Sequence, residues 1–128
     1  MPSYDGQGFH PPAPVATVTL RTEDGERSLN DVVMLIDSGA DVSLIPESSV
    51  RQLGLEGRQE DYELIGFDGN KSIGKSVRCE LIFLRRAFQG AYLVVDDTTG
   101  ILGRDVLNHL SLLLDGPGLT WREVRTAR

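Results

Sequence analysis

The sequence predicts a mostly β fold, a small closed barrel-like domain with one or two short helices. Apolar and β-branched residues recur in many short runs, and Gly, Pro and Asp-Gly signals separate these runs. Only two segments have the apolar spacing of a short helix. The 128 residues fit a single domain, whose core would cover roughly two thirds of the unfolded surface.

The N-terminal part of the chain predicts an arm followed by two strands. Residues 1–14 are rich in Gly and Pro, which disfavours a regular ladder, so we expect a flexible arm there and the folded domain over residues 15–124. Apolar residues alternate from Val15 to Leu20, and Asp24–Gly25 is a hairpin dipeptide. The nearly continuous apolar run from Asp31 to Ile36 is typical of a strand covered on both faces.

The middle of the chain predicts one helix and one hairpin. Residues 47–53 have the spacing of a short helix, and Gly54 is placed to end it. Residues 62–74 predict two strands joined by a turn at Asp68 and Gly69. The Gly content of this hairpin favours mobility.

The remaining elements continue the β pattern. Strands are predicted over residues 76–84 and 91–95, and a second short helix within residues 102–110. The runs 112–114 and 119–121 predict a closing hairpin around an Asp-Gly-Pro-Gly turn.

Composition excludes several classes of function. The net charge of −6 and pI near 4.8 argue against a nucleic-acid partner, which needs clustered Lys and Arg. No apolar run is long enough to span a membrane, and no secretion signal is visible, so we expect a cytoplasmic protein without a membrane partner. Cys79 is the only cysteine, so an internal disulfide is impossible, and we expect it to be a half-buried packing residue.

The candidate functional motif is the tetrad Asp37, Ser38, Gly39 and Ala40, which follows an apolar strand. A carboxylate at the end of a buried strand is costly to desolvate unless local groups hold it. Gly39 permits a tight turn and close backbone approach. The tetrad alone is also compatible with an ordinary strand-end turn without chemistry.

Three features in sequence order make residues 15–121 resemble the retropepsin-like aspartic proteases. They are the apolar strand that leads into the tetrad, the Gly-bearing hairpin, and the later segment Gly100–Leu107. The resemblance implies an aspartic endopeptidase with Asp37 as the catalytic residue. The chain has one tetrad, so the implied enzyme is a homodimer in which two Asp37 carboxylates share one proton and activate water. It implies a peptide or protein substrate and no cofactor or metal.

The resemblance also assigns supporting roles around the catalytic residue. Ser38 stands where Thr is commoner and would brace the two loops of the dimer, and Gly39 would turn its carbonyl towards the peptide. Ala40 would border the pocket. It lacks a hydroxyl that could stabilise the charged carboxylate, so we expect activity at less acidic pH than in pepsin-type enzymes. Asp41 and Arg104 match a pair that forms a salt bridge in retroviral members.

The hairpin matches the flap that closes over substrate in this family. The expected substrate-binding flap residues are Ile65, Gly66, Phe67, Asp68 and Gly69. Its polar tip departs from the glycine-richer retroviral flap, so substrate choice does not transfer. Leu112–Leu114 matches the strand at the dimer interface, but here the chain continues into a hairpin, so the dimer sheet is expected to be built differently.

Two other functions remain open at this level. A non-catalytic module of the same fold would serve dimerisation or peptide capture. The intact tetrad disfavours it, because placing two carboxylates together destabilises a dimer that needs only contact. The weaker alternative is an acid-site hydrolase of another substrate class.

Overall fold

The computed structural model describes residues 2–66 and 68–125. Within them the chain forms these elements in order: β1 (Tyr4–Asp5), β2 (Ala13–Arg21), β3 (Ser28–Ile36), β4 (Leu44–Pro46), α1 (Glu47–Gln52), the 3-10 helix η1 (Glu56–Arg58), β5 (Glu60–Ile65), β6 (Lys71–Phe83), β7 (Arg86–Val95), β8 (Gly100–Leu102), α2 (Arg104–Leu107), β9 (Leu112–Asp115) and β10 (Thr120–Glu123). The predicted mostly β class with two short α-helices is confirmed. No helix in the described residues is both long and apolar enough to cross a membrane.

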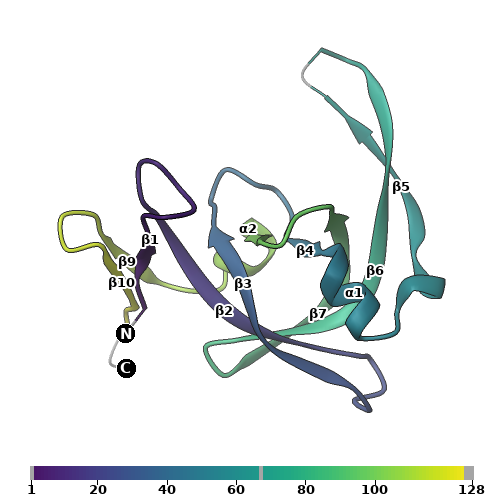
Figure 1. Ribbon diagram of the computed structural model, residues 1–128, viewed down its shortest axis with the longest axis horizontal. Helices are drawn as coiled ribbons and strands as arrows, with labels where there is room; N and C mark the ends of the chain where they lie inside the picture. The colour runs from purple at the N-terminus through teal and green to yellow at the C-terminus, as the bar shows by residue number, and fades with distance from the viewer. Residues whose placement is uncertain (1, 67, 126–128) are drawn as a thin grey trace.

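Strand pairing closes the main sheet into a barrel. The eight strands follow the order β1-β2-β3-β8-β4-β7-β6-β5, and an additional pairing of β2 with β6 joins the two sides. In Figure 1 the strands wrap around a central core, the β5–β6 hairpin extends away from the barrel, and β9 and β10 form a separate hairpin beside β1. Closure leaves few unpaired strand edges in the body of the fold.

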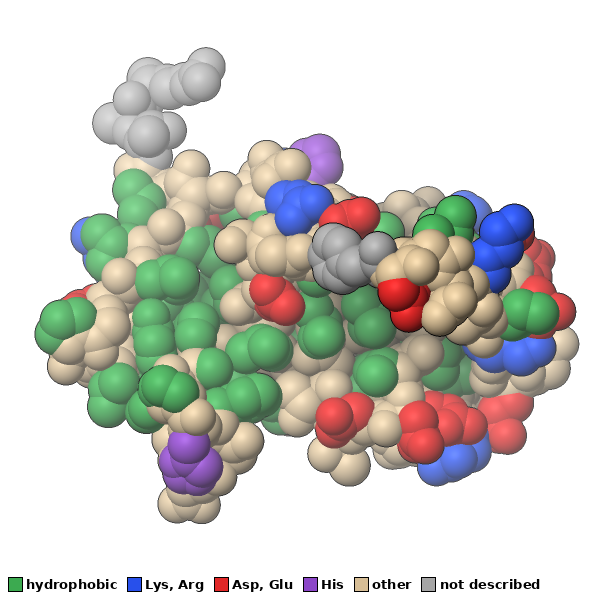
Figure 2. Space-filling model, turned by 90° about the horizontal axis from the view of Figure 1, so that it is seen from above, with side chains coloured by type: hydrophobic (Ala, Val, Ile, Leu, Met, Phe, Trp, Pro, Cys, Tyr) green, Lys and Arg blue, Asp and Glu red, His purple; other side chains and the backbone are tan. Residues whose placement is uncertain are grey.

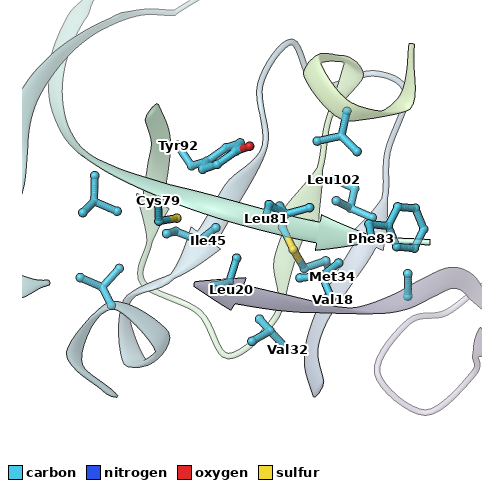
Figure 3. Packing of buried hydrophobic residues seen from close by; sticks show 14 of the residues in the cluster. Val18, Leu20, Val32, Met34, Ile45, Cys79, Leu81, Phe83, Tyr92 and Leu102 are labelled. Carbon is cyan, nitrogen blue, oxygen red and sulfur yellow. The ribbon is translucent and has the colours of Figure 1, made fainter. Parts of the chain in front are cut away.

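The core fills the barrel with apolar side chains, aliphatic and aromatic, from facing strands. The residues seen in Figure 3 include Val18, Leu20, Val32, Met34, Ile45, Cys79, Leu81, Phe83, Tyr92 and Leu102. Alternation within each strand puts these side chains on one face. Cys79 is fully buried, deeper than the predicted half-buried position, and burial raises the pKa of its thiol to about 12. The sulfur therefore acts as a packing atom.

The N-terminal segment is paired in part with the rest of the fold. Tyr4 lies opposite Pro14 in the β1–β2 pair, and its N–H donates to the Leu119 carbonyl at 3.0 Å. Ser3 forms a bridge with Thr120. Backbone hydrogen bonds thus hold residues inside the segment predicted as a flexible arm. Local composition did not reveal the contacts with Leu119 and Thr120, because these two partners come from the other end of the chain.

Two strand boundaries differ from the prediction. The strands predicted on either side of residue 75 form one continuous strand, β6, because Gly74 does not interrupt the ladder. A Cβ at this position would lie 3.0 Å from the Leu64 side chain, so Gly here permits close cross-strand contact. Strand β7 starts at Arg86, before the predicted start, after a turn in which Leu84 and Arg85 have positive φ angles.

Glu80 is a buried carboxylate on β6 with defined partners. Gln89 Nε2 donates to its Oε2 at 3.1 Å, and Arg21 Nε donates to its Oε1 at 2.7 Å. These hydrogen bonds, that of Gln89 first and those of Arg21 next, lower the pKa of Glu80 below its ordinary 4.5. A lowered native pKa contributes stability above pH 4.5, and this contribution is lost as the pH falls through the native value.

We therefore expect Glu80→Gln to flatten the acid side of the stability profile. The wild type should lose melting temperature between pH 5 and pH 3 faster than the variant, since only the wild type must protonate this carboxylate. Melting temperatures from circular dichroism at several pH values test the difference. If the melting temperatures of wild type and variant fall in parallel down to pH 3, the lowered pKa of Glu80 does not contribute to stability.

Candidate active site

Asp37 is positioned by two parallel strands. It follows directly on β3, whose last residues run parallel to β8 with Leu35 opposite Ile101 and Ile36 opposite Leu102. The Asp37 N–H donates to the Leu102 carbonyl at 3.0 Å, which continues the ladder by one residue. The predicted location at the end of an apolar strand is therefore observed, and the strand fixes the direction in which the loop starts.

The tetrad folds into a tight turn around the Asp37 carboxylate. The Gly39 N–H donates to Asp37 Oδ1 at 2.9 Å, and the Ala40 N–H donates to the Asp37 carbonyl at 3.2 Å. Asp37 is half-buried, while Ser38 and Gly39 are exposed. A backbone donor thus holds one carboxylate oxygen at the surface of the loop, where a second molecule can reach the group.

Arg104, the first residue of α2, connects the helix to both sides of the loop. Its Nη1 donates to the Ser38 carbonyl and its Nη2 to Asp41 Oδ1, each at 2.7 Å. Its backbone N–H also donates to the Ala40 carbonyl at 2.9 Å. The Asp41 side chain is 84% exposed, so the ion pair itself adds little stability. The fork of the guanidinium instead fixes the shape of the loop.

A buried network that the sequence did not indicate lies beneath the same loop. Asp105 accepts two hydrogen bonds from Ser43, one from the backbone N–H at 3.0 Å and one from the hydroxyl at 2.7 Å. The Ser43 Oγ in turn accepts from the Gly103 N–H at 2.9 Å. Ser43 is fully buried. The network therefore joins the end of the tetrad loop to the segment between β8 and α2.

Removal of the Asp105 carboxylate should loosen this connection. In Asp105→Ala, two donors of the buried Ser43 lose their acceptor, and we expect the free energy of unfolding to fall by about 2 kcal/mol. Chemical denaturation measures the change. Asp105→Asn should cost less, because its amide oxygen can still accept from the Ser43 N–H.

A matched control is the exposed Asp96, whose change to Ala should alter stability by less than about 0.5 kcal/mol. Equal stability of Asp105→Ala and Asp96→Ala would show that the network does not support the loop.

The predicted flap residues lie on and next to the β5–β6 hairpin. Ile65 ends β5, and the turn is closed by hydrogen bonds from the Gly66 N–H to the Asn70 carbonyl and from the Gly69 N–H to the Gly66 carbonyl. Asp68 Oδ1 accepts from the Asn70 N–H. Gly69 has φ of +81°, a conformation that favours glycine. Phe67 lies outside the described residues.

The hairpin stands apart from the loop that carries Asp37 (Figure 1). Ion pairs between Lys71 and Glu63 and between Lys75 and Asp61 link its two strands. Ile65 and Ile73 are 70% and 74% exposed, although isoleucine normally avoids water to this extent. Ile65 and Ile73 are therefore free to contact a bound ligand or another molecule.

Within the described residues, no group of three or more His, Cys, Asp or Glu side chains is arranged to hold a metal ion. The residues that the structure does bring together are Asp37 with its tetrad, Arg104 with Asp41, and the Ser43–Asp105 network. The hairpin residues form a second group, which lies apart from the loop that carries Asp37 (Figure 1).

Comparison with known proteins agrees with this geometry. The protein family described as aspartyl protease matches residues 16–106. Among solved structures, the EIAV protease complexed with the inhibitor HBY-793 is similar at 28% sequence identity, with a TM-score of 0.55. The match covers 76% of this chain and 86% of that one. No curated protein matches significantly.

Proposed function

The chain belongs to the retropepsin-like aspartyl protease family, and on this premise we propose that it is an aspartic endopeptidase that acts as a homodimer. Family and fold support a peptidase in general. The observation that carries the finer proposal is Asp37, which lies half-buried at the end of β3 with its carboxylate held by the Gly39 N–H. A single chain supplies one such carboxylate, and this chemistry needs two.

In the proposed reaction, Asp37 from each subunit shares one proton across a two-fold axis. The ionised carboxylate takes a proton from a water molecule, which attacks the scissile carbonyl. The protonated carboxylate donates a hydrogen bond to the carbonyl oxygen, and no covalent acyl-enzyme forms. Two carboxylates so close cannot easily both ionise, so the pair supplies an acid and a base together.

The surrounding residues would hold the substrate and the loop. We propose that Arg104 and Asp41 fix the loop shape, that Ser38 braces the two loops and that the Gly39 carbonyl faces the peptide backbone, with Ala40 at the border of the pocket. The β5–β6 hairpin would close over an extended peptide, pair with its backbone and exclude water. A cytoplasmic location and the absence of a nucleic-acid partner stay predictions from composition.

The test is cleavage of a peptide library or an unfolded protein by the purified chain. An aspartic endopeptidase should cut internal peptide bonds and should be inhibited by a statine-type peptide mimic, which resembles the tetrahedral intermediate. Undetectable cleavage across the library by a folded, dimeric chain would favour the non-catalytic module. Cleavage that the mimic does not inhibit would favour a hydrolase of another mechanism.

A further inference from the structure

Strand β5 forms an open edge of the main sheet. It is the last strand in the sheet order, and within residues 2–66 and 68–125 it pairs with β6 alone. Every residue of the strand is exposed, Tyr62 by 46% and Leu64 by 36%, so the rest of the described chain leaves it open to solvent. An exposed strand edge is a ready template for pairing with another chain.

The turn of the hairpin shows which backbone groups lie on this edge. The Gly66 N–H donates to the Asn70 carbonyl at 2.9 Å, which makes these two residues a hydrogen-bonded pair. Ile65 belongs to the next pair of the ladder. Hydrogen-bonded and non-hydrogen-bonded pairs alternate along an antiparallel ladder, so the N–H and C=O groups of Asp61, Glu63 and Ile65 point away from β6. The free edge therefore presents backbone donors and acceptors at alternate residues.

The side chains of these edge residues make one face of the hairpin acidic. Asp61 and Glu63 lie on the same face, because alternate residues of a strand do so. Each forms an ion pair with a lysine of β6, yet their side chains stay 67% and 59% exposed. The two lysines lie on the β6 side of the carboxylates, so a strand added to the free edge would meet the carboxylates first.

A shallow pocket of about 490 Å³ on the hairpin is lined by Asp61, Tyr62, Glu63, Lys71, Ser72 and Ile73. Ile73 lies opposite Glu63 and is 74% exposed. Lys and Arg side chains can lay their methylene groups on such an apolar surface while the charged end stays with a carboxylate. In Figure 2 charged side chains dominate the end that carries the hairpin, whereas hydrophobic ones gather over the other half. The pocket therefore suits a long basic side chain.

We propose that β5 binds an extended segment of another protein that carries Lys or Arg at alternate positions. The segment adds a strand to the sheet, with two basic side chains opposite Asp61 and Glu63. A second copy of β5 fits less well. Antiparallel pairing of two β5 strands on an axis at Tyr62 or Glu63 places carboxylate opposite carboxylate, which destabilises a sheet. This inference goes beyond the proposed function, because it involves no cleavage.

A fluorescent peptide in which Lys and Val alternate tests the pairing. Asp37→Asn serves as the binding chain so that the probe is not cleaved, and fluorescence anisotropy measures the dissociation constant. The lysines opposite Asp61 and Glu63 turn their backbone groups towards β5, and the valines turn theirs away. N-methylation of the lysine amides should therefore weaken binding at least about tenfold, and N-methylation of the valine amides by less than about twofold.

The two methylated peptides have the same charge and composition, so they separate strand pairing from general attraction between opposite charges. Equal dissociation constants for the two peptides, or no binding of the unmethylated probe, would refute the proposed edge site.

Charge reversal on the chain tests the acidic side of the contact. Glu63→Lys in the Asp37→Asn background should weaken binding of the Lys-Val probe at least about tenfold, because like charges then face each other. The matched control is Asp96→Lys, which changes the net charge equally at an exposed residue between β7 and β8. Circular dichroism checks that both variants are folded. If both bind the probe equally, net charge alone attracts it and the edge site is wrong.

Competition separates the edge site from the proposed active site. A saturating statine-type mimic should leave the Lys-Val probe bound, because the hairpin stands apart from the loop that carries Asp37 (Figure 1). Displacement of the probe by the mimic would place the probe in the substrate site and refute the edge site.

The edge site and the endopeptidase fail in different ways. A chain that discriminates between the two methylated probes but cleaves no library peptide would keep the edge site and refute the endopeptidase. A chain that cleaves library peptides but binds both methylated probes alike would keep the endopeptidase and refute the edge site.

Discussion

Asp37→Asn should abolish peptide cleavage while the fold and the dimer persist. The amide can neither take a proton from water nor share one with a second carboxylate, and loss of acid–base catalysis should lower kcat/KM by at least about 1,000-fold. The amide oxygen of Asn can still accept from the Gly39 N–H, which now bonds Asp37 Oδ1, so the turn should be retained. Cleavage of a fluorogenic peptide found in the library gives the rate.

Mixing experiments show whether the two carboxylates come from two chains. If subunits exchange freely, dimers of wild type and Asp37→Asn hold one carboxylate and should be inactive. Activity at constant total protein should then fall as the square of the wild-type fraction. A linear fall would mean that each chain carries a complete site, and undiminished activity of Asp37→Asn alone would remove Asp37 from the mechanism.

The parts of the fold that local pattern determines were predictable. The apolar run before Asp37, the helix that Gly54 ends and the turn at Asp68 and Gly69 depend on residues close in sequence, and the structure has all three. The resemblance also implied the contact of Arg104 with Asp41, which is present. Val33 differs from expectation, because the run suggested a strand covered on both faces and this side chain is 38% exposed.

The contacts that the sequence did not indicate join residues that are far apart in the chain. Ser43 and Asp105 are 62 residues apart, and each one alone is typical of a turn or a helix start. Only the fold shows that the carboxylate satisfies a buried hydroxyl below the candidate site. The pairing of Tyr4 with Leu119 has the same origin, since no local pattern identifies the partner of a two-residue strand.

Gly103→Ala should strongly disturb the loop that carries Asp37. Gly103 lies between β8 and α2 with an extended backbone, φ −96° and ψ −173°, which alanine adopts without strain. The difficulty is steric, because no room is left for a side chain. A Cβ here would lie 2.6 Å from the carbonyl carbon and oxygen of Val42 and 2.9 Å from the Ala40 oxygen. These backbone atoms belong to the loop that holds Asp37, so they can yield only if the loop moves.

We therefore expect Gly103→Ala to lower the free energy of unfolding by about 3 kcal/mol or more, and the melting temperature by on the order of 10 °C. Cleavage below the melting temperature should also fall, because the shifted loop separates the two carboxylates. The matched control is Gly57→Ala, where a Cβ would meet no atom within 4 Å. If both variants melt and cleave like the wild type, close packing of Gly103 against the loop does not hold Asp37 in place.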